Sequence, residues 1–427
     1  MGGSCTPFPC DDGKLGEQET DIDCGGGTCH KCAGSRHCLV AADCYSGSCD
    51  AFTRTCTSLT TVSFAGEMPY DSGDKTYALL SGDLNGDGHI DLAAANEQGN
   101  SISVFLNNGD GTFRRLGPFT TGAYPVGGAI ADFNHDGIPD VITSDYHGNS
   151  VSVLFGIAAA PGKGSGMLGP AAIYPTADGA ETQNLALGDL NGDGNLDVVT
   201  ANPSAIALVP SVSQFLGRAD GTFGPANTVT VGVAGSEPYS VAIGDFDGDG
   251  AADMAIGDLV NGPIIVRLGN GDGTFKPDVL YPPGGVGAHY VIAVDVDLDG
   301  KLDLVSANRG SRDISVLLGR GDGTFKKPRR FRATPDTTFD AGPYSLAVAD
   351  FNRDGVPDLV APNYGLSTGS ILLGVGDGSF EPPIDAGTTG DNSYGVAVGD
   401  FNGDGNPDFA TANANSDNVT VKLSTSH

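Results

Sequence analysis

The sequence predicts an all-β protein, a seven-bladed β-propeller of four-stranded blades behind a small disulfide-rich amino-terminal module. Three observations lead to this prediction. An aspartate-rich motif of nine residues recurs seven times along residues 83–408, and short apolar runs separated by glycine-rich turns surround every copy. All nine cysteines lie within the first 56 residues. Short strands repeated with a period of about 50 residues are typical of propeller-like arrays.

The amino-terminal segment, residues 1–57, is predicted to be a module held together by cross-links. It contains too little apolar material for a core of its own, and disulfides are the favoured interpretation of its cysteines. The spacing Cys29-x-x-Cys32 would also suit zinc, although a second half-site is not clearly supplied. Because nine is an odd number, one cysteine must remain unpaired, and the outermost cysteine, Cys5, is the candidate for this free thiol.

Residues 58–427 form the predicted propeller, in which each repeat reads as four strands. In the fourth repeat YSVAIGDF leads into the aspartate motif, DMAIGD leaves it, IIVRLG follows, and GDGTF precedes a shorter last run. The glycines of GDGTF allow the positive φ that a tight turn needs. In the second repeat a longer loop, APGKGSG, replaces this turn.

The two ends of the propeller sequence complement each other. The seventh repeat stops after three strands at VTVKLSTSH, whereas residues 60–71, TTVSFAGEMPYD, precede the first motif and resemble the fourth strands of other repeats. We therefore expect residues 60–71 to complete the seventh blade. Such closure joins the chain ends and leaves no exposed blade edge between them.

Each aspartate motif has the ligand pattern of a calcium loop. Positions 1, 3 and 5 carry carboxylates or amides, position 6 is glycine, position 7 offers a carbonyl, and position 9 is always aspartate. Oxygen ligands without soft donors favour Ca²⁺, and Mg²⁺ prefers to keep its waters. We expect about seven structural Ca²⁺ sites instead of solvated aspartate turns. The expected ligands are Asp83, Asn85, Asp87, His89, Asp91, Asp132, Asn134, Asp136, Ile138, Asp140, Asp189, Asn191, Asp193, Asn195, Asp197, Asp245, Asp247, Asp249, Ala251, Asp253, Asp295, Asp297, Asp299, Lys301, Asp303, Asp350, Asn352, Asp354, Val356, Asp358, Asp400, Asn402, Asp404, Asn406 and Asp408.

The pattern DxNxDGxxD, followed by AN and by SVSVLLGxGDGTF, resembles the FG-GAP or VCBS repeat family over about residues 60–427. Integrin α-subunit propellers and fungal and bacterial propeller lectins belong to that family. The resemblance implies a seven-bladed propeller with calcium in the loops between strands one and two. It also implies ligand binding on the opposite face. The cysteine-rich segment is similar to short modules that precede secreted or surface repeats in predatory bacteria.

Two registers of residues are expected on the face opposite the aspartate loops. Five residues after each ninth-position aspartate stand Asn96, Asp145, Asn202, Asp258, Asn308, Asn363 and Asn413. Six residues before each first-position aspartate stand Tyr77, Val126, Gln183, Tyr239, His289, Tyr344 and Tyr394. Hydrogen bonding within turns or between blades, and packing at the start of a strand, would explain both registers without a ligand.

A binding function would combine the two registers. Aromatic rings and amides repeated around the ring would form several similar shallow pockets between blades, which suit sugar hydroxyls and multivalent binding. The predicted ligand-binding residues are Tyr77, Asn96, Tyr239, Asn308, Tyr344, Asn363, Tyr394 and Asn413. We expect a calcium-stabilised, lectin-like protein that binds glycans or cell-surface glycoconjugates. A protein-adhesion scaffold that binds a protein surface is the alternative.

Other classes of function are disfavoured. The net charge of −31 would repel a phosphate backbone, so we expect no nucleic-acid partner. No run of about 18 apolar residues predicts membrane insertion. The sequence contains no GxSxG, HExxH or P-loop motif, and no enzyme is expected. A polysaccharide-active site that uses Tyr290, His289 and Arg309 is the less favoured alternative. We expect a secreted or cell-surface location, although the printed chain starts without a signal peptide.

Overall fold

The computed structural model describes residues 62–176, 180–203, 210–260, 263–282, 284–335 and 342–426. The module predicted for residues 1–57 lies outside these ranges, so its disulfides, the zinc alternative and the unpaired Cys5 stay predictions. The described residues form strands and turns, as the sequence predicts. None of their segments is a helix long and apolar enough to cross a membrane.

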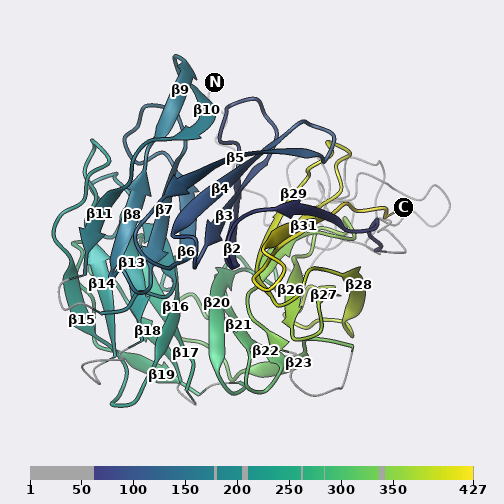
Figure 1. The fold of residues 1–427 in the computed structure, drawn as a ribbon. Helices are drawn as coiled ribbons and strands as arrows, with labels where there is room; N and C mark the ends of the chain where they lie inside the picture. The colour runs from purple at the N-terminus through teal and green to yellow at the C-terminus, as the bar shows by residue number, and fades with distance from the viewer. Residues whose placement is uncertain are drawn as a thin grey trace, which may run out of the picture.

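Seven antiparallel sheets surround a common axis and form the predicted seven-bladed propeller (Figure 1). Blade 1 consists of β2 (Thr76–Gly82), β3 (Asp91–Asn96), β4 (Ser101–Asn107) and β5 (Phe113–Thr120). Blade 2 consists of β6 (Pro125–Ala131), β7 (Asp140–Asp145), β8 (Ser150–Leu154) and β11 (Ala172–Pro175). Blade 3 consists of β12 (Leu185–Gly188), β13 (Asp197–Asn202), β14 (Ser211–Phe215) and β15 (Asn227–Thr230). Blades 4 and 5 consist of β16 (Pro238–Gly244), β17 (Asp253–Asp258), β18 (Ile264–Arg267) and β19 (Val279–Tyr281), and of β20 (Ala288–Val294), β21 (Asp303–Asn308), β22 (Asp313–Leu317) and β23 (Arg329–Arg332).

The last two blades depart from the simple order of four consecutive strands. In blade 6 the innermost strand is interrupted, so that β24 (Gly342–Pro343) and β25 (Ala347–Ala349) both pair with β26 (Asp358–Tyr364), which β27 (Thr368–Leu372) and β28 (Ile384–Thr388) follow. Blade 7 consists of β29 (Ser393–Gly399), β30 (Asp408–Asn413) and β31 (Asn418–Lys422), with β1 (Met68–Asp71) as its outermost strand.

The seventh blade confirms the predicted closure. Strand β1 pairs antiparallel with β31, so that Met68 lies opposite Val421 and Asp71 opposite Asn418. An isolated bridge joins Phe64 to Ser424. The Phe64 ring packs edge-on against Phe409 at 4.8 Å between ring centroids. The amino-terminal strand therefore completes the ring, as residues 60–71 predict.

Apolar side chains between neighbouring blades form the core. In six of the seven blades the second strand is buried along its whole length, as in DLAAAN of β3 and DMAIGD of β17. One cluster combines Leu92 and Phe105 of blade 1 with Ala410 and Val421 of blade 7. Strands covered on both faces read as near-continuous apolar runs, whereas the outermost strands are largely exposed.

The loop that replaces GDGTF in the second repeat forms a hairpin of its own. Strands β9 (Gly156–Ala160) and β10 (Lys163–Leu168) pair only with each other and project from the ring beside β5 (Figure 1). In four other blades the GDGTF turn closes with a bridge to its phenylalanine or to the equivalent residue, for example Gly269 to Phe275. The alternative loop therefore changes the rim of blade 2 and leaves its four-stranded sheet intact.

Candidate functional site

The aspartate loops connect the first and second strands of each blade, and their ninth-position aspartate is buried. In the first loop, Asp91 Oδ2 accepts the Leu84 N–H at 2.9 Å, and Asp91 Oδ1 accepts the Asn107 N–H at 2.8 Å. Equivalent pairs of backbone bonds occur in the other six loops. This aspartate thus joins its own loop to the end of the third strand.

The remaining loop carboxylates fix the turn itself. Asp83 accepts the N–H groups of Gly86 and Gly88 at 2.7 and 2.8 Å, and Asp87 accepts the His89 N–H at 2.9 Å. The glycine at position 6 has a φ between 79° and 90° in all seven loops, a conformation that only glycine adopts without strain. The sequence pattern therefore holds several oxygens on one side of a sharp turn.

Two loops bring three carboxylates close enough to hold one metal ion. Oxygen atoms of Asp245, Asp247 and Asp253 lie within 4.8 Å of one another, and those of Asp295, Asp297 and Asp303 do the same. In the second group Asp297 Oδ1 is buried without a hydrogen-bond partner. A buried, unpartnered carboxylate oxygen is costly unless a cation meets it, so this group fits a hard cation.

Burial and like charge act together at these sites. Burial, assisted by the neighbouring loop carboxylates, raises the pKa of Asp253 and of Asp303 to about 6 and that of Asp358 to about 8. A divalent cation would favour the ionised forms again. Loops four and five therefore meet the expectation of metal loops most closely. At position 3 the other five loops carry asparagine, which offers an amide oxygen in place of a carboxylate.

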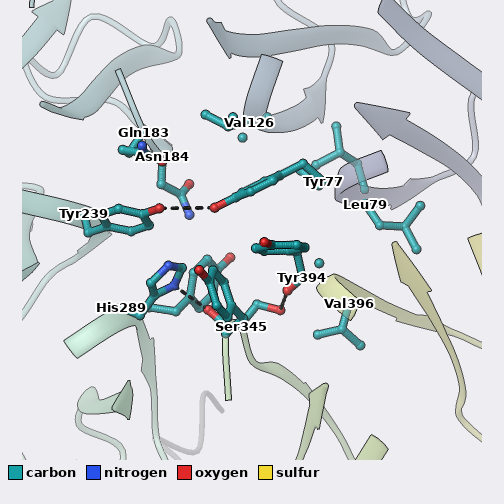
Figure 2. Close-up of a pocket in the computed structure, with 17 residues that line it drawn as sticks. Tyr77, Leu79, Val126, Gln183, Asn184, Tyr239, His289, Ser345, Tyr394 and Val396 are labelled. Carbon is teal, nitrogen blue, oxygen red and sulfur yellow. Dashed lines mark hydrogen bonds between the residues drawn. The ribbon is translucent and has the colours of Figure 1, made fainter. Parts of the chain in front are cut away.

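The tyrosine register converges on the propeller axis. All seven of its residues line one cavity, which the innermost strands of all seven blades surround (Figure 2). The members are Tyr77, Val126, Gln183, Tyr239, His289, Tyr344 and Tyr394. We call this cavity the axial chamber. It differs from the several pockets expected between blades, because residues that begin the innermost strands lie beside the axis.

Aromatic contacts shape the axial chamber. The Tyr77 and Tyr394 rings stack at 4.4 Å between centroids, and Tyr344 meets Tyr394 edge-on at 4.4 Å. The Tyr77 and Tyr239 hydroxyls hydrogen-bond across the chamber at 3.2 Å (Figure 2). The cavity has a volume of about 70 Å³. Its wall thus combines apolar ring faces with hydroxyl groups that can donate or accept hydrogen bonds.

His289 adds a hydrogen-bond acceptor to the chamber. The side chain is 4% exposed, and its Nδ1 lies 2.7 Å from the Tyr344 carbonyl oxygen (Figure 2). Burial, with a smaller effect of the Arg309 charge, lowers the pKa of His289 to about 3. A neutral imidazole that donates Nδ1–H to this carbonyl keeps a lone pair on Nε2. Nε2 is buried and has no partner among the described residues.

A cation stands beside two of the aromatic rings. The Arg309 guanidinium lies 4.7 Å from the centroid of Tyr344 and 5.4 Å from that of Tyr364. Such distances are typical of a cation–π interaction. Of the residues in the predicted catalytic alternative, His289 and Tyr290 line the chamber, whereas Arg309 does not.

The asparagine register lies inside the blades. Asn96, Asn308, Asn363 and Asn413 are 0 to 1% exposed, and none of them lines the axial chamber. Their amide nitrogens donate to side-chain oxygens of the following turn and strand, as Asn96 does to Ser103 at 3.1 Å. This geometry matches the hydrogen-bonding explanation of the register. A role of these four residues in ligand binding stays a prediction.

A shallow groove also lies between blades 7 and 1, on the face where pockets between blades were expected. It has a volume of about 460 Å³. Its lining consists of Asp74, Lys75, Gln98, Ala414, Asn415 and Asp417. Asp417 Oδ1 accepts the Lys75 N–H at 2.7 Å and so joins the two blades. The groove contains none of the eight predicted ligand-binding residues. Asp417 has a counterpart in blade 1, where Asn100 Oδ1 accepts the Tyr124 N–H at 2.8 Å.

The fold and the acidic loops define a seven-bladed propeller with candidate metal loops between the first and second strands. The FG-GAP-like repeat matches residues 83–143, 189–256, 295–361 and 363–411, more than half of the chain. The chain therefore belongs to the FG-GAP-like repeat family, as the sequence motifs indicate. No curated protein sequence matches it.

Solved structures share the fold at low sequence identity. A lectin of Agrocybe aegerita that recognises non-reducing terminal N-acetylglucosamine is 21% identical, with a TM-score of 0.51 over 83% of this chain and 86% of that chain. A Lactobacillus plantarum protein is 15% identical, with a TM-score of 0.55 over 83% and 92% of the two chains. The Dos1 propeller is 9% identical, with a TM-score of 0.52 over 85% and 95%. These similarities concern the fold.

Proposed function

We propose that this propeller is a carbohydrate-binding protein and that a terminal sugar residue enters the axial chamber. The observation that carries the proposal is the unpartnered His289 Nε2, a buried acceptor in a wall of tyrosine rings. A sugar presents hydroxyl donors along its rim and apolar C–H groups on its faces. The chamber offers the complement of both, with Asn184 as a further polar group in its wall.

The size of the chamber agrees with one small ligand. A volume of about 70 Å³ corresponds to roughly five to seven water positions, when one water occupies about 10–15 Å³ of such volume. Those waters would take up about 150 to 200 Å³ as liquid, which is comparable to one sugar ring. A longer glycan would leave the remainder of its chain on the face outside the chamber.

The protonation states of two side chains in the chamber, His289 and Tyr290, favour binding over catalysis. Burial lowers the pKa of His289 to about 3, so the imidazole is a weak base near neutral pH. Burial also raises the pKa of Tyr290 above its usual range and keeps this phenol protonated. These groups suit hydrogen bonding to a bound hydroxyl better than proton transfer.

Calcium has a structural role in this proposal. All seven aspartate loops would hold Ca²⁺ through their carboxylate, amide and carbonyl oxygens, and the ions would neutralise much of the loop charge. The Asp245 and Asp295 groups, in which three carboxylates already meet, support this assignment. Millimolar calcium is found outside cells, so we propose a secreted or cell-surface location.

A glycan array, measured with calcium and with EDTA, tests the function. We expect binding to glycans with a shared terminal sugar, and the free monosaccharide should compete. N-acetylglucosamine belongs in the set because a lectin with the same fold recognises it. Binding that no free sugar reduces would indicate a protein-like or non-specific surface and would contradict the proposal.

Two chamber variants locate the site. Tyr239→Phe removes a hydroxyl that faces the chamber, and we expect about threefold to tenfold weaker binding, the effect of one hydrogen bond. His289→Phe removes the acceptor and fills space, so a larger loss is expected. Tyr174→Phe is the matched control because Tyr174 lies on β11 at the rim. Full binding by both chamber variants, with unchanged melting temperatures, would refute the site.

A further inference from the structure

The outer half of blade 5 concentrates positive charge in an acidic chain. Residues 312–332 contain seven of the 22 lysines and arginines but only two of the 53 acidic residues. Their cations are Arg312, Arg320, Lys326, Lys327, Arg329, Arg330 and Arg332. The protein as a whole has a net charge of −31, so this segment has the opposite sign to its surroundings.

Strand β23 presents much of this charge at the rim of the propeller. It is the outermost strand of its blade, and all three of its arginines are exposed. Its third residue, Phe331, packs edge-on against Phe380 at 5.5 Å between ring centroids and so anchors the strand to blade 6. We call Lys327, Arg329, Arg330 and Arg332, with Arg312 beside them, the basic edge.

Internal ion pairs neutralise only part of the basic edge. Arg330 bonds to Asp313, and Arg329 approaches the Asp377 carboxylate at 3.8 Å. Lys327 and Arg332 are exposed and have no ion-pair partner within the ranges that the structure describes. Among the residues that the structure describes, the edge therefore keeps an excess of positive charge at the surface.

A hollow of about 400 Å³ lies within this edge. It is lined by Ser311, Arg312, Asp313, Arg330, Phe331 and Arg332. Ligand sites commonly have volumes of about 300 to 1,000 Å³. Guanidinium groups border this space together with the Asp313 carboxylate, to which Ser311 donates a hydrogen bond and Arg330 is paired. An anionic group of a larger molecule in this space would meet the guanidinium groups.

Protection against edge-to-edge aggregation is the simpler explanation of charges on an outer strand. The equivalent strands β15, NTVT, and β19, VLY, carry no charged residue, and neither does β11, AIYP. The outermost strands of three blades therefore carry no cations. Edge protection alone does not explain three arginines in four residues of β23.

We propose that the basic edge of blade 5 binds an anionic polysaccharide that carries carboxylate or sulfate groups. Arginine forks bind such groups through paired hydrogen bonds. Alternate residues of a strand point to the same side about 6.6 Å apart, which places Arg332 in a row with Arg330. The Arg330 fork already bonds to Asp313 through Nε and Nη2, so Arg332 and Lys327 are the cations that carry this proposal. Charges more than about 8 Å away are largely screened at physiological salt, so the acidic remainder of the surface does not cancel this attraction.

Nucleic acid and membrane fit the basic edge less well. Binding of single strands uses exposed aromatic rings on which bases stack, whereas Phe331 is packed against Phe380. Insertion into a membrane interface needs exposed apolar side chains beside the cations, and β23 presents none. The basic edge is also distinct from the axial chamber, so this proposal is independent of the proposed monosaccharide site.

Binding of dextran sulfate, polygalacturonate and uncharged dextran to the whole protein tests the proposal. We expect the two anionic polymers to bind in about 50 mM NaCl and more weakly in about 200 mM NaCl. Uncharged dextran should not bind. The triple variant Lys327→Gln, Arg329→Gln, Arg332→Gln should bind the anionic polymers at least about tenfold more weakly than the unaltered protein. Arg330 is left in place because it bonds to Asp313.

A control variant removes the same number of charges elsewhere. Arg114→Gln, Arg115→Gln, Lys163→Gln alters exposed cations of blade 1 and of the blade 2 hairpin. It should retain binding within about twofold, since it leaves the basic edge intact. Equal losses in both variants would show that only net charge matters and would overturn the proposal. Equal binding of duplex DNA or anionic vesicles, or no polymer binding by the unaltered protein, would overturn it as well.

Discussion

Asp145 provides a quantitative test of how the blades are built. It occupies in blade 2 the register position that asparagine occupies in five other blades. The carboxyl group is fully buried and accepts hydrogen bonds from Ser152 at 2.6 Å, Thr143 at 2.8 Å and Ser150 at 3.0 Å. Burial raises the pKa of Asp145 to about 6, despite these hydrogen bonds. An ionised Asp145 is therefore a cost that asparagine would avoid.

The sign and size of the effect follow from linkage. The pKa of Asp145 is about 6 in the folded protein, and an unperturbed aspartate has a pKa of about 3.9. Because the folded-state pKa is the higher one, folding is favoured when Asp145 is protonated and disfavoured when it is ionised. The wild-type protein therefore has its full stability from this group below about pH 4 and loses it as the pH rises through about 6. A difference of about two pKa units corresponds to about 3 kcal/mol. Asp145→Asn should therefore raise the free energy of unfolding by up to about 3 kcal/mol at pH 8 and little at pH 4.

Thermal unfolding at the two pH values measures this difference. An unfolding entropy of about 2.1 cal/mol/K per residue over residues 62–426 converts 3 kcal/mol to about 4 °C at pH 8. Asp71→Asn is the control, because Asp71 lies exposed on β1 and its replacement removes one negative charge without relieving a buried carboxylate. That control should gain no stability at pH 8. An Asp145→Asn protein with the wild-type melting temperature at both pH values would refute the reasoning.

Two further predictions concern the metal loops and the closure of the ring. Chelation of calcium should lower the melting temperature by about 10 °C or more, since seven sites of about 1.4 kcal/mol each sum to about 10 kcal/mol; an unchanged melt with EGTA would contradict structural ions. Phe64→Ala should destabilise the protein by about 2–3 kcal/mol, because the half-buried ring contacts Phe409 and Phe351. Ile173→Ala, at a side chain that is 54% exposed, should cost less than about 0.5 kcal/mol in the same unfolding assay. Equal stability of these two variants would argue against a closing role of the amino-terminal strand.

The sequence predicts the fold well because the information is local and repeated. Each aspartate loop specifies its own turn, and each turn connects apolar runs of strand length. The closure of blade 7 was also predictable, because the missing fourth strand and the extra first strand have matching patterns. The pairing of Met68 with Val421 confirms that reasoning across the whole length of the propeller.

The site was predictable only in part, because it depends on contacts between distant strands. The register of Tyr77, Tyr239, Tyr344 and Tyr394 is visible in the sequence, but their convergence on one axis requires the closed ring. The acceptor role of His289 depends on the Tyr344 carbonyl, a backbone group that carries no sequence signal. Sequence reasoning also missed Asn184, which stands next to Gln183 and so falls outside the register.

The asparagine register carries a sequence signal that distinguishes a structural role of these residues from a ligand-binding role. Asn96 is followed by serine five and seven residues later, and it donates to both Ser101 and Ser103. Asn413 is followed by Asn418 and Thr420 at the same spacings and makes the same contacts. Partners at fixed positions on the next strand indicate a hydrogen-bond network inside each blade. That spacing is readable from the sequence once the strands are placed.

A crystal structure of the protein with the best monosaccharide from the glycan array tests the central claim most directly. The account predicts a sugar ring in the axial chamber, against the rings of Tyr239 and Tyr344, with a hydroxyl within hydrogen-bond distance of His289 Nε2. A sugar bound only in the groove between blades 7 and 1, or elsewhere on the surface, with water in the axial chamber, would contradict it.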